Sequence, residues 1–189
     1  MNQKMDIRLK TILIIVLFLL FNNGCKKTMV LAVGDAYQGG IIAYLFVSGD
    51  PGYNSSTQHG IIAAVNDQGV SDWGCNTQLV GSNGKAIGTG NLNTQTIVTG
   101  CSALGIPARL CTDLVVDNYS DWYLPSVDEL DKLFKNRDLI GGFSTDTYWS
   151  STEAMNTYAW GYSFVSSNQT GGGIGYKSKL FSVRAVRTF

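Results

Sequence analysis

The spacing of apolar residues predicts strands at both ends of the chain and helices between them. Early in the chain, two β-rich apolar runs bounded by turn residues predict a hairpin with a long polar connection. Late in the chain, apolar and polar residues alternate with a period of two, which is typical of half-buried strands. The predicted strands are Gly39–Phe46, Gly60–Val65, Tyr148–Glu153, Tyr158–Phe164 and Phe181–Arg187, with Gly171–Gly173 and Gly175 as a turn before the last.

Helical signals fill the middle of the chain. The clearest one lies at Ser126, which forms an S-x-x-E capping box with Glu129 ahead of an apolar stripe that ends near Asn136. Because strands precede and follow the helical part, the pattern predicts an α+β fold with a mostly antiparallel sheet.

Two shorter helices are predicted before this one. Asn93–Thr94 can cap a helix that runs towards Ala103. Pro107 can begin a second helix, whose apolar positions reach Val115.

Basic residues followed by an unbroken apolar run open the chain. Lys4, Arg8 and Lys10 precede Ile12–Phe21, which is the order found in secretory signals. A helix of this length spans roughly 15 Å, about half the hydrocarbon thickness of a bilayer. We therefore interpret the run as an export signal and not as a membrane span.

Cys25 follows Gly24 at the place where a lipoprotein signal would be cut and a lipid joined to the thiol. We interpret residues 1–24 as a lipoprotein signal peptide, 25–33 as a tether and 34–189 as a single domain. This places the protein in the cell envelope, anchored by lipid at the outer membrane or cell surface. The alternative is ordinary signal cleavage nearby, with Cys25 as an unused thiol.

The charge of the exported part argues against one class of partner. The signal contains three basic residues and one acidic residue of the 14 of each in the chain, so its removal leaves a net charge of −2. A chain with this balance lacks a general basic field, and we expect no nucleic-acid binding.

Three cysteines remain after Cys25, in a chain that the signal directs to an oxidising compartment. Cys75 lies in a Gly/Asn-rich loop, and Cys101 lies beside Gly100, so we favour a disulfide between Cys75 and Cys101. A bond between Cys101 and Cys111 is the alternative. Cys111 lies in an apolar helical context and is predicted to be a buried thiol.

Residue types needed for catalysis are sparse. His59 is the one histidine and lies in a polar loop sequence, so we expect no histidine-based catalysis, no metal site and no other cofactor. The carboxylates in the Ser126 helix lie where a helix N-terminus favours negative charge. Glu153 is predicted to pair with Arg184 or Arg187. We expect no enzymatic activity; a carboxylate-based enzyme that uses Asp121 or Glu153 is the alternative.

Tyrosines surrounded by small polar residues distinguish the last third of the chain. Most tryptophans there, Trp160 included, are predicted to be scaffold. Tyr with Ser and Asn is typical of adaptable binding surfaces, because Tyr offers contact area at low entropic cost. A solvated hairpin loop is the alternative. The candidate ligand-binding residues are Asn156, Tyr158, Tyr162, Ser166, Asn168, Gln169 and Tyr176.

Several ordered motifs resemble the Lcl C-terminal domain family of bacterial surface and secreted proteins. They are Asp121–Ser126, Asp128–Leu130, Ile140–Phe143, Tyr148–Glu153, Ala159–Trp160, Phe164 and Val183–Arg187, with Gly39–Ile42, Gly60–Ala63, Trp73–Cys75, Gly88–Gly90 and Asn93–Thr94 upstream. The resemblance implies a C-type-lectin-like fold of the formylglycine-generating-enzyme type, with a twisted antiparallel sheet, short flanking helices and long loops. In similar proteins diversified by retroelements, the variable residues match Ala154–Lys179 here.

The resemblance carries no activity with it. The calcium and sugar motifs of true C-type lectins are absent, and no cysteine follows Cys111, so the paired cysteines of formylglycine-generating enzymes are absent too. We expect a lipid-anchored envelope protein whose lectin-like domain binds an extracellular glycan or protein in adhesion or recognition. A purely structural envelope protein is a further alternative.

Overall fold

Two sheets organise the computed structural model, which describes residues 30–165 and 172–189. Backbone contacts place Leu31–Phe189 in one unit. The predicted signal and Cys25 lie outside the described residues, as do Ser166, Asn168 and Gln169. The fold is α+β with mostly antiparallel strands, as predicted. In the described residues, no helix has the length and apolarity needed to cross a membrane.

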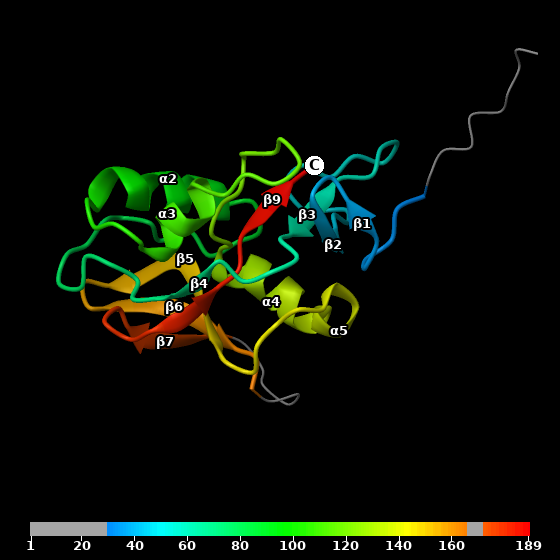
Figure 1. The fold of residues 1–189 in the computed structure, drawn as a ribbon. Helices are drawn as coiled ribbons and strands as arrows, with labels where there is room; N and C mark the ends of the chain where they lie inside the picture. The colour runs from blue at the N-terminus through cyan, green and yellow to red at the C-terminus, as the bar shows by residue number, and fades with distance from the viewer. Residues whose placement is uncertain (1–29, 166–171) are drawn as a thin grey trace, which may run out of the picture. The chain divides into compact units, whose positions relative to one another are not determined.

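The first sheet contains the predicted early hairpin. Its strands lie in the order β1 (Ala36–Tyr37), β2 (Gly40–Leu45), β3 (Gly60–Ala63) and β9 (Val186–Thr188), and all neighbours are antiparallel. The chain therefore returns at its C-terminal end to pair with β3, as Figure 1 shows.

The second sheet has five strands and carries most of the late part of the chain. Its order is β4 (Gly69–Ser71), β8 (Phe181–Val183), β5 (Thr147–Met155), β6 (Tyr158–Ser163) and β7 (Gly173–Tyr176). Only β5 and β8 pair in parallel among these described strands.

Two predictions about the last strands are wrong. Gly173 and Gly175 belong to strand β7 rather than to a turn, and Gly175 is needed there because a Cβ would lie 2.8 Å from the ring of Phe181. The predicted strand Phe181–Arg187 is two strands, β8 and β9, in different sheets. Residues 182–187 are all buried, so burial does not mark the break between the two strands.

The helices lie between the two groups of strands in sequence: α2 (Gly90–Gly100), α3 (Pro107–Thr112), α4 (Val127–Lys135) and α5 (Arg137–Ile140). Helix α4 confirms the capping box, since Ser126 and Glu129 each accept the other's backbone N–H. Pro107 begins α3 as predicted, but this helix ends at Thr112 rather than near Val115.

The N-cap of helix α2 lies four residues before Asn93, the first residue of the predicted cap. Thr89 is its N-cap, so Asn93 and Thr94 lie inside the helix and are buried. Their polar side chains bind backbone instead of capping: Asn93 Nδ2 donates to Gly84 O, and Thr94 Oγ1 donates to Gly90 O and to Leu124 O. Polar residues that satisfy buried carbonyls in this way resemble caps in sequence.

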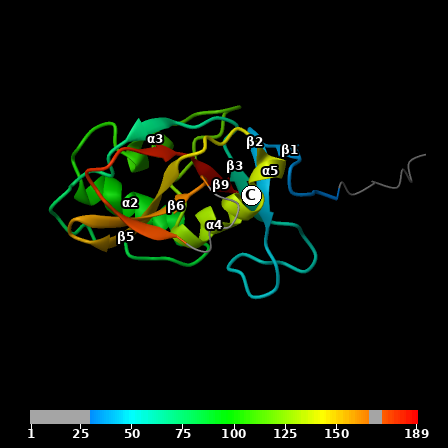
Figure 2. The ribbon, with the colours of Figure 1, turned by 90° about the horizontal axis from the view of Figure 1, so that it is seen from below.

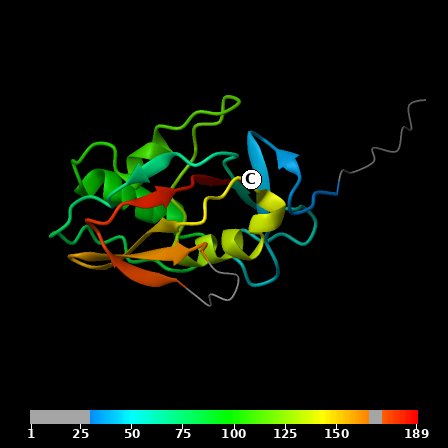
Figure 3. The ribbon, with the colours of Figure 1, turned by 60° about the horizontal axis from the view of Figure 1, so that its bottom comes forward.

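Packing fixes α4 between the two sheets. Leu130 and Phe134 join a core cluster with Ala43 and Ile61 of the first sheet and Tyr162 of the second. Helices α2 and α3 lie against another part of the five-stranded sheet, where Ile97 and Ala108 cluster with Trp149 and Ala159. Figures 2 and 3 show α4 beside β6 from two further directions. One face of the second sheet is therefore covered by α4 only in part.

The disulfide joins Cys75 to Cys101, which confirms the favoured pairing. It links the loop after β4 to the C-cap of α2. Cys111 is a buried thiol as predicted, and burial raises its pKa.

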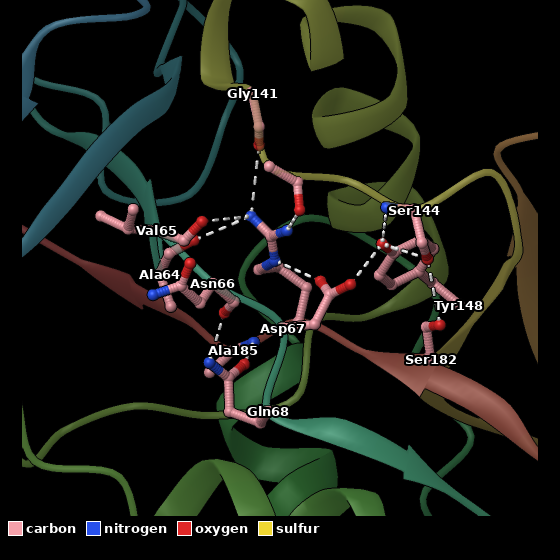
Figure 4. Close-up of polar contacts among 12 residues, drawn as sticks. Ala64, Val65, Asn66, Asp67, Gln68, Gly141, Ser144, Tyr148, Ser182 and Ala185 are labelled. Atoms are coloured by element: carbon pink, nitrogen blue, oxygen red, sulfur yellow. Dashed lines mark hydrogen bonds and ion pairs between the residues drawn. The ribbon is translucent and has the colours of Figure 1, made fainter.

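A buried arginine, Arg184, links the turn after β3 to the loop that follows α5. Figure 4 shows its partners Val65, Asp67 and Gly141. Arg184 is fully buried, and its Nε lies 2.7 Å from Asp67 Oδ1. Its terminal nitrogens donate to the carbonyls of Ala64, Val65, Gly141 and Gly142. The other carboxylate oxygen of Asp67 accepts from the Tyr148 hydroxyl at 2.7 Å. Between β8 and β9, where the strands of the two sheets are interrupted, Arg184 is thus held by side-chain hydrogen bonds.

Candidate ligand-binding face

Strands β6 and β7 expose one face of the second sheet beyond the end of α4. Residues two apart along a strand point to the same side, and directly paired residues share a side. Tyr158 and Trp160 of β6 therefore lie on the same side as their partners Tyr176 and Ile174 of β7. We call these four residues the β6–β7 face. Tyr162 continues the same side, but α4 covers it.

The two tyrosines of this face contact each other. The rings of Tyr158 and Tyr176 have centroids 4.4 Å apart, with planes tilted by 34°. A hydrogen bond with Tyr176 raises the pKa of the Tyr158 hydroxyl. Asn156 lies in the exposed turn between β5 and β6. The structure thus brings together two of the predicted ligand-binding residues, Tyr158 and Tyr176.

A depression of about 500 Å³ lies beside Trp160. This volume is within the range of ligand sites. Met155 and Ile174 line it with apolar side chains that are 55% and 50% exposed. Asn83 and Lys85, from the loop before α2, line it with polar side chains.

Hydrogen-bond donors around the depression are not used by the described parts of the protein. The Lys85 ammonium lies 4.1 Å from the centroid of the Trp160 ring, an attractive cation–π contact, and in the described residues it has no carboxylate partner. The Asn83 side-chain amide and the Trp160 indole N–H have no hydrogen-bond partner within residues 30–165 and 172–189. These three groups can bind a ligand without breaking an internal hydrogen bond or ion pair of the described residues.

Glu153 is the carboxylate at this depression, and it is engaged elsewhere. Its predicted arginine partner is wrong: Glu153 Oε1 lies 2.6 Å from Nζ of Lys177, and both side chains are almost fully buried. Its oxygens also accept the backbone N–H groups of Val80 and Gly81. The ring of Trp73 and the carbonyl of Gln78 complete the surroundings of the ammonium. Charge and hydrogen bonds are therefore satisfied inside the protein.

The other candidate carboxylates are also held in structural contacts. Asp121 binds Arg187 through both oxygens, at 2.7 and 2.9 Å, and this hydrogen bonding holds the pKa of the carboxyl below its usual value. Glu129 is fully buried in the capping box, and desolvation raises its pKa. Both carboxylates named for acid–base chemistry, Asp121 and Glu153, thus lie in ion pairs.

Helix α2 begins with glycine because of this buried carboxylate. A Cβ at Gly90 would lie 2.1 Å from Glu129 Oε2 and 2.8 Å from the backbone nitrogen of Ser126. Gly88 N–H donates to the other oxygen of Glu129 at 2.8 Å. The capping box of α4 therefore also fixes the loop that carries Lys85.

Not all predicted ligand-binding residues meet at the face. Tyr162 is 1% exposed, and its hydroxyl donates to Asp131 of α4, so it is a core residue and its predicted surface role is wrong. Ser166, Asn168 and Gln169 lie outside the described residues. Trp160 and Lys85 were not predicted as site residues. The sequence signal for Trp160 was an aromatic residue between two tyrosines at alternate positions. The signal for Lys85 was a lone lysine in a glycine-rich loop.

The described residues contain no cluster of three or more histidine, cysteine or acidic side chains that could hold a metal ion. His59 is partly buried, and its Nδ1 lies 3.0 Å from the carbonyl oxygen of Phe189. It lies in the loop between β2 and β3, whose strands belong to the other sheet.

Comparison with known proteins relates the chain to others through fold alone. No family model matches it, and no curated protein matches it. Among solved structures it is similar to a fimbrial protein from Bacteroides ovatus, with a TM-score of 0.52 and 15% sequence identity. The match covers 84% of this chain and 45% of that protein, so this chain spans about half of its length. The resemblance to the Lcl C-terminal domain family stays a prediction.

Proposed function

We propose that this chain is a cell-envelope protein that recognises an extracellular ligand, a glycan or a protein, through the β6–β7 face. The observation that carries the proposal is a partly exposed aromatic surface on the five-stranded sheet, with unused donors beside it. Aromatic side chains on a sheet offer large contact area at low entropic cost. The likeness to a fimbrial protein agrees with a surface role.

We also propose that the fold is C-type-lectin-like and of the formylglycine-generating-enzyme type. The antiparallel sheets, short helices and long loops support this proposal. The face would then lie on a scaffold known for tolerating sequence change.

Removing the aromatic rings of the face is expected to weaken ligand binding at least about thirtyfold, since buried aromatic anchors dominate binding energy. The change is Tyr158→Ser, Trp160→Ala and Tyr176→Ser together, made in the chain from Lys26 to Phe189 and measured on arrays of glycans and extracellular proteins. Tyr53→Ser is the matched control, because Tyr53 is exposed and lies in the loop after β2. Unchanged binding by the triple variant, with its fold retained, would refute the site.

Lipid attachment at Cys25 is the second part of the proposal. Cys25→Ser is expected to abolish incorporation of labelled palmitate and to release the protein from the membrane fraction, because the thiol is the attachment atom. The control is Cys111→Ser, which removes a buried thiol outside the predicted signal. An unlabelled wild-type protein would leave ordinary signal cleavage as the explanation, and equal labelling of the Cys25 variant would contradict attachment at this residue.

A further inference from the structure

The side chains around the depression favour one kind of ligand. We propose that the depression binds an extended protein segment, with an apolar side chain against Trp160 and a neighbouring carboxylate held by Lys85. This inference rests on the proposed function and narrows its ligand from a glycan or a protein to a protein segment.

The apolar lining is the first argument for a protein segment. Met155 and Ile174 flank Trp160 and are about half exposed. Sugar hydroxyls that are covered by such side chains lose hydrogen bonds to water without gaining others. An apolar peptide side chain loses nothing there, and tryptophan and methionine suit it, since Trp dominates protein interfaces and Met adapts its shape.

The charge of the depression is the second argument, and it explains why the proposed ligand carries a carboxylate. Glu153, the acidic residue among those that line it, is neutralised by Lys177. Lys85 has no such partner: Asp128 is close enough for its carboxyl to be influenced by this ammonium, but the two form no ion pair in the described chain. One positive charge without an ion-pair partner in the described chain therefore borders the apolar lining.

The edge position of β7 is the third argument. β7 is the outermost strand of its sheet (Figure 1). Lys177 N–H donates to Thr157 O directly opposite it, and hydrogen-bonded pairs alternate along an antiparallel ladder. The N–H and C=O of Ile174 thus point away from β6, and no described residue binds them. An extended segment can pair with this backbone, as strand addition does in other peptide-binding proteins.

A selection followed by a pairwise comparison tests the proposal. Random 12-residue peptides displayed on phage are selected on the chain from Lys26 to Phe189, with counter-selection on the Trp160→Ala variant. We expect the enriched peptides to share an apolar residue next to Asp or Glu. The strongest is then synthesised with that acid and with its amide, and affinities are measured for wild type, Lys85→Met and Lys179→Met. Lys179 is the matched control, an exposed lysine that does not line the depression.

The expected result is a thirtyfold or greater loss with Trp160→Ala, on the order of hot-spot truncations. The amide peptide and Lys85→Met should each lose about fivefold, and together little more than either alone, because they break the same contact. Lys179→Met should bind as wild type.

Three results would overturn the inference. One is that no peptide depends on Trp160, and a second is that acid and amide peptides bind equally. The third is a glycan that binds through Trp160 while no peptide does, in which case the proposed function survives and only the ligand class is wrong. If neither peptides nor glycans depend on the face, the proposed function fails as well.

Discussion

Lys177→Met is expected to lower the free energy of unfolding by about 3–5 kcal/mol, because it leaves the carboxylate of Glu153 buried without its cation. The Lys177 side chain has no exposed area, and its ammonium contacts Glu153 at 2.6 Å, Gln78 O at 2.8 Å and the ring of Trp73. Methionine fills similar space but supplies no charge. Urea unfolding followed by tryptophan fluorescence measures the change, since Trp73 lies at the pair.

A double variant separates the lost charge pair from lost packing. With Glu153→Gln added, the buried charge disappears, and we expect part of the stability to return, because the amide oxygen can still accept from Val80 or Gly81. Lys179→Met is the control and should change stability by less than about 0.5 kcal/mol. A Lys177→Met protein as stable as wild type would show that the pair contributes nothing.

Arg184→Lys is expected to cost about 3 kcal/mol although the charge is kept, because the planar fork of arginine binds several acceptors at once and an ammonium cannot. Nε binds Asp67, while the two terminal nitrogens bind backbone carbonyls of two separate loops. Lysine would leave at least one of these buried acceptors without a donor.

Thermal unfolding of the Arg184→Lys protein measures this effect, and Arg137→Lys is the matched control. Arg137 binds Phe134 O and a largely exposed Asp138, so its replacement should cost well under 1 kcal/mol. Equal losses for the two variants would mean that the network around Arg184 contributes no more to stability than the contacts of Arg137. Hydrogen exchange should also rise first at Gly141, whose N–H binds Arg137 O beside the lost contact.

Local signals in the sequence predicted local structure. The capping box at Ser126 and Glu129 needs only four consecutive residues, and the structure has it as predicted. The early hairpin was also predictable, since its strands are β-rich runs bounded by turns. The disulfide followed from the loop positions of Cys75 and Cys101.

Contacts that depend on strand order could not be predicted from the sequence. Glu153 was expected to pair with Arg184 or Arg187, but β7 lies at the edge of the sheet and brings Lys177 to it instead. Tyr162 and Tyr158 have the same alternation in sequence. Only the position of α4 decides that Tyr162 is buried and Tyr158 is not.

The burial of Cys111 affects which two cysteines form the disulfide. Thiolates, not thiols, exchange with disulfides, and burial raises the pKa of Cys111 in the folded protein. Cys101 and Cys111 are only ten residues apart, so an open chain can join them at low entropic cost. Once α3 packs, Cys111 is buried and no longer reacts with Cys101. Mispaired molecules must therefore arise before the core forms, and the native bond, once made, is safe from the third cysteine.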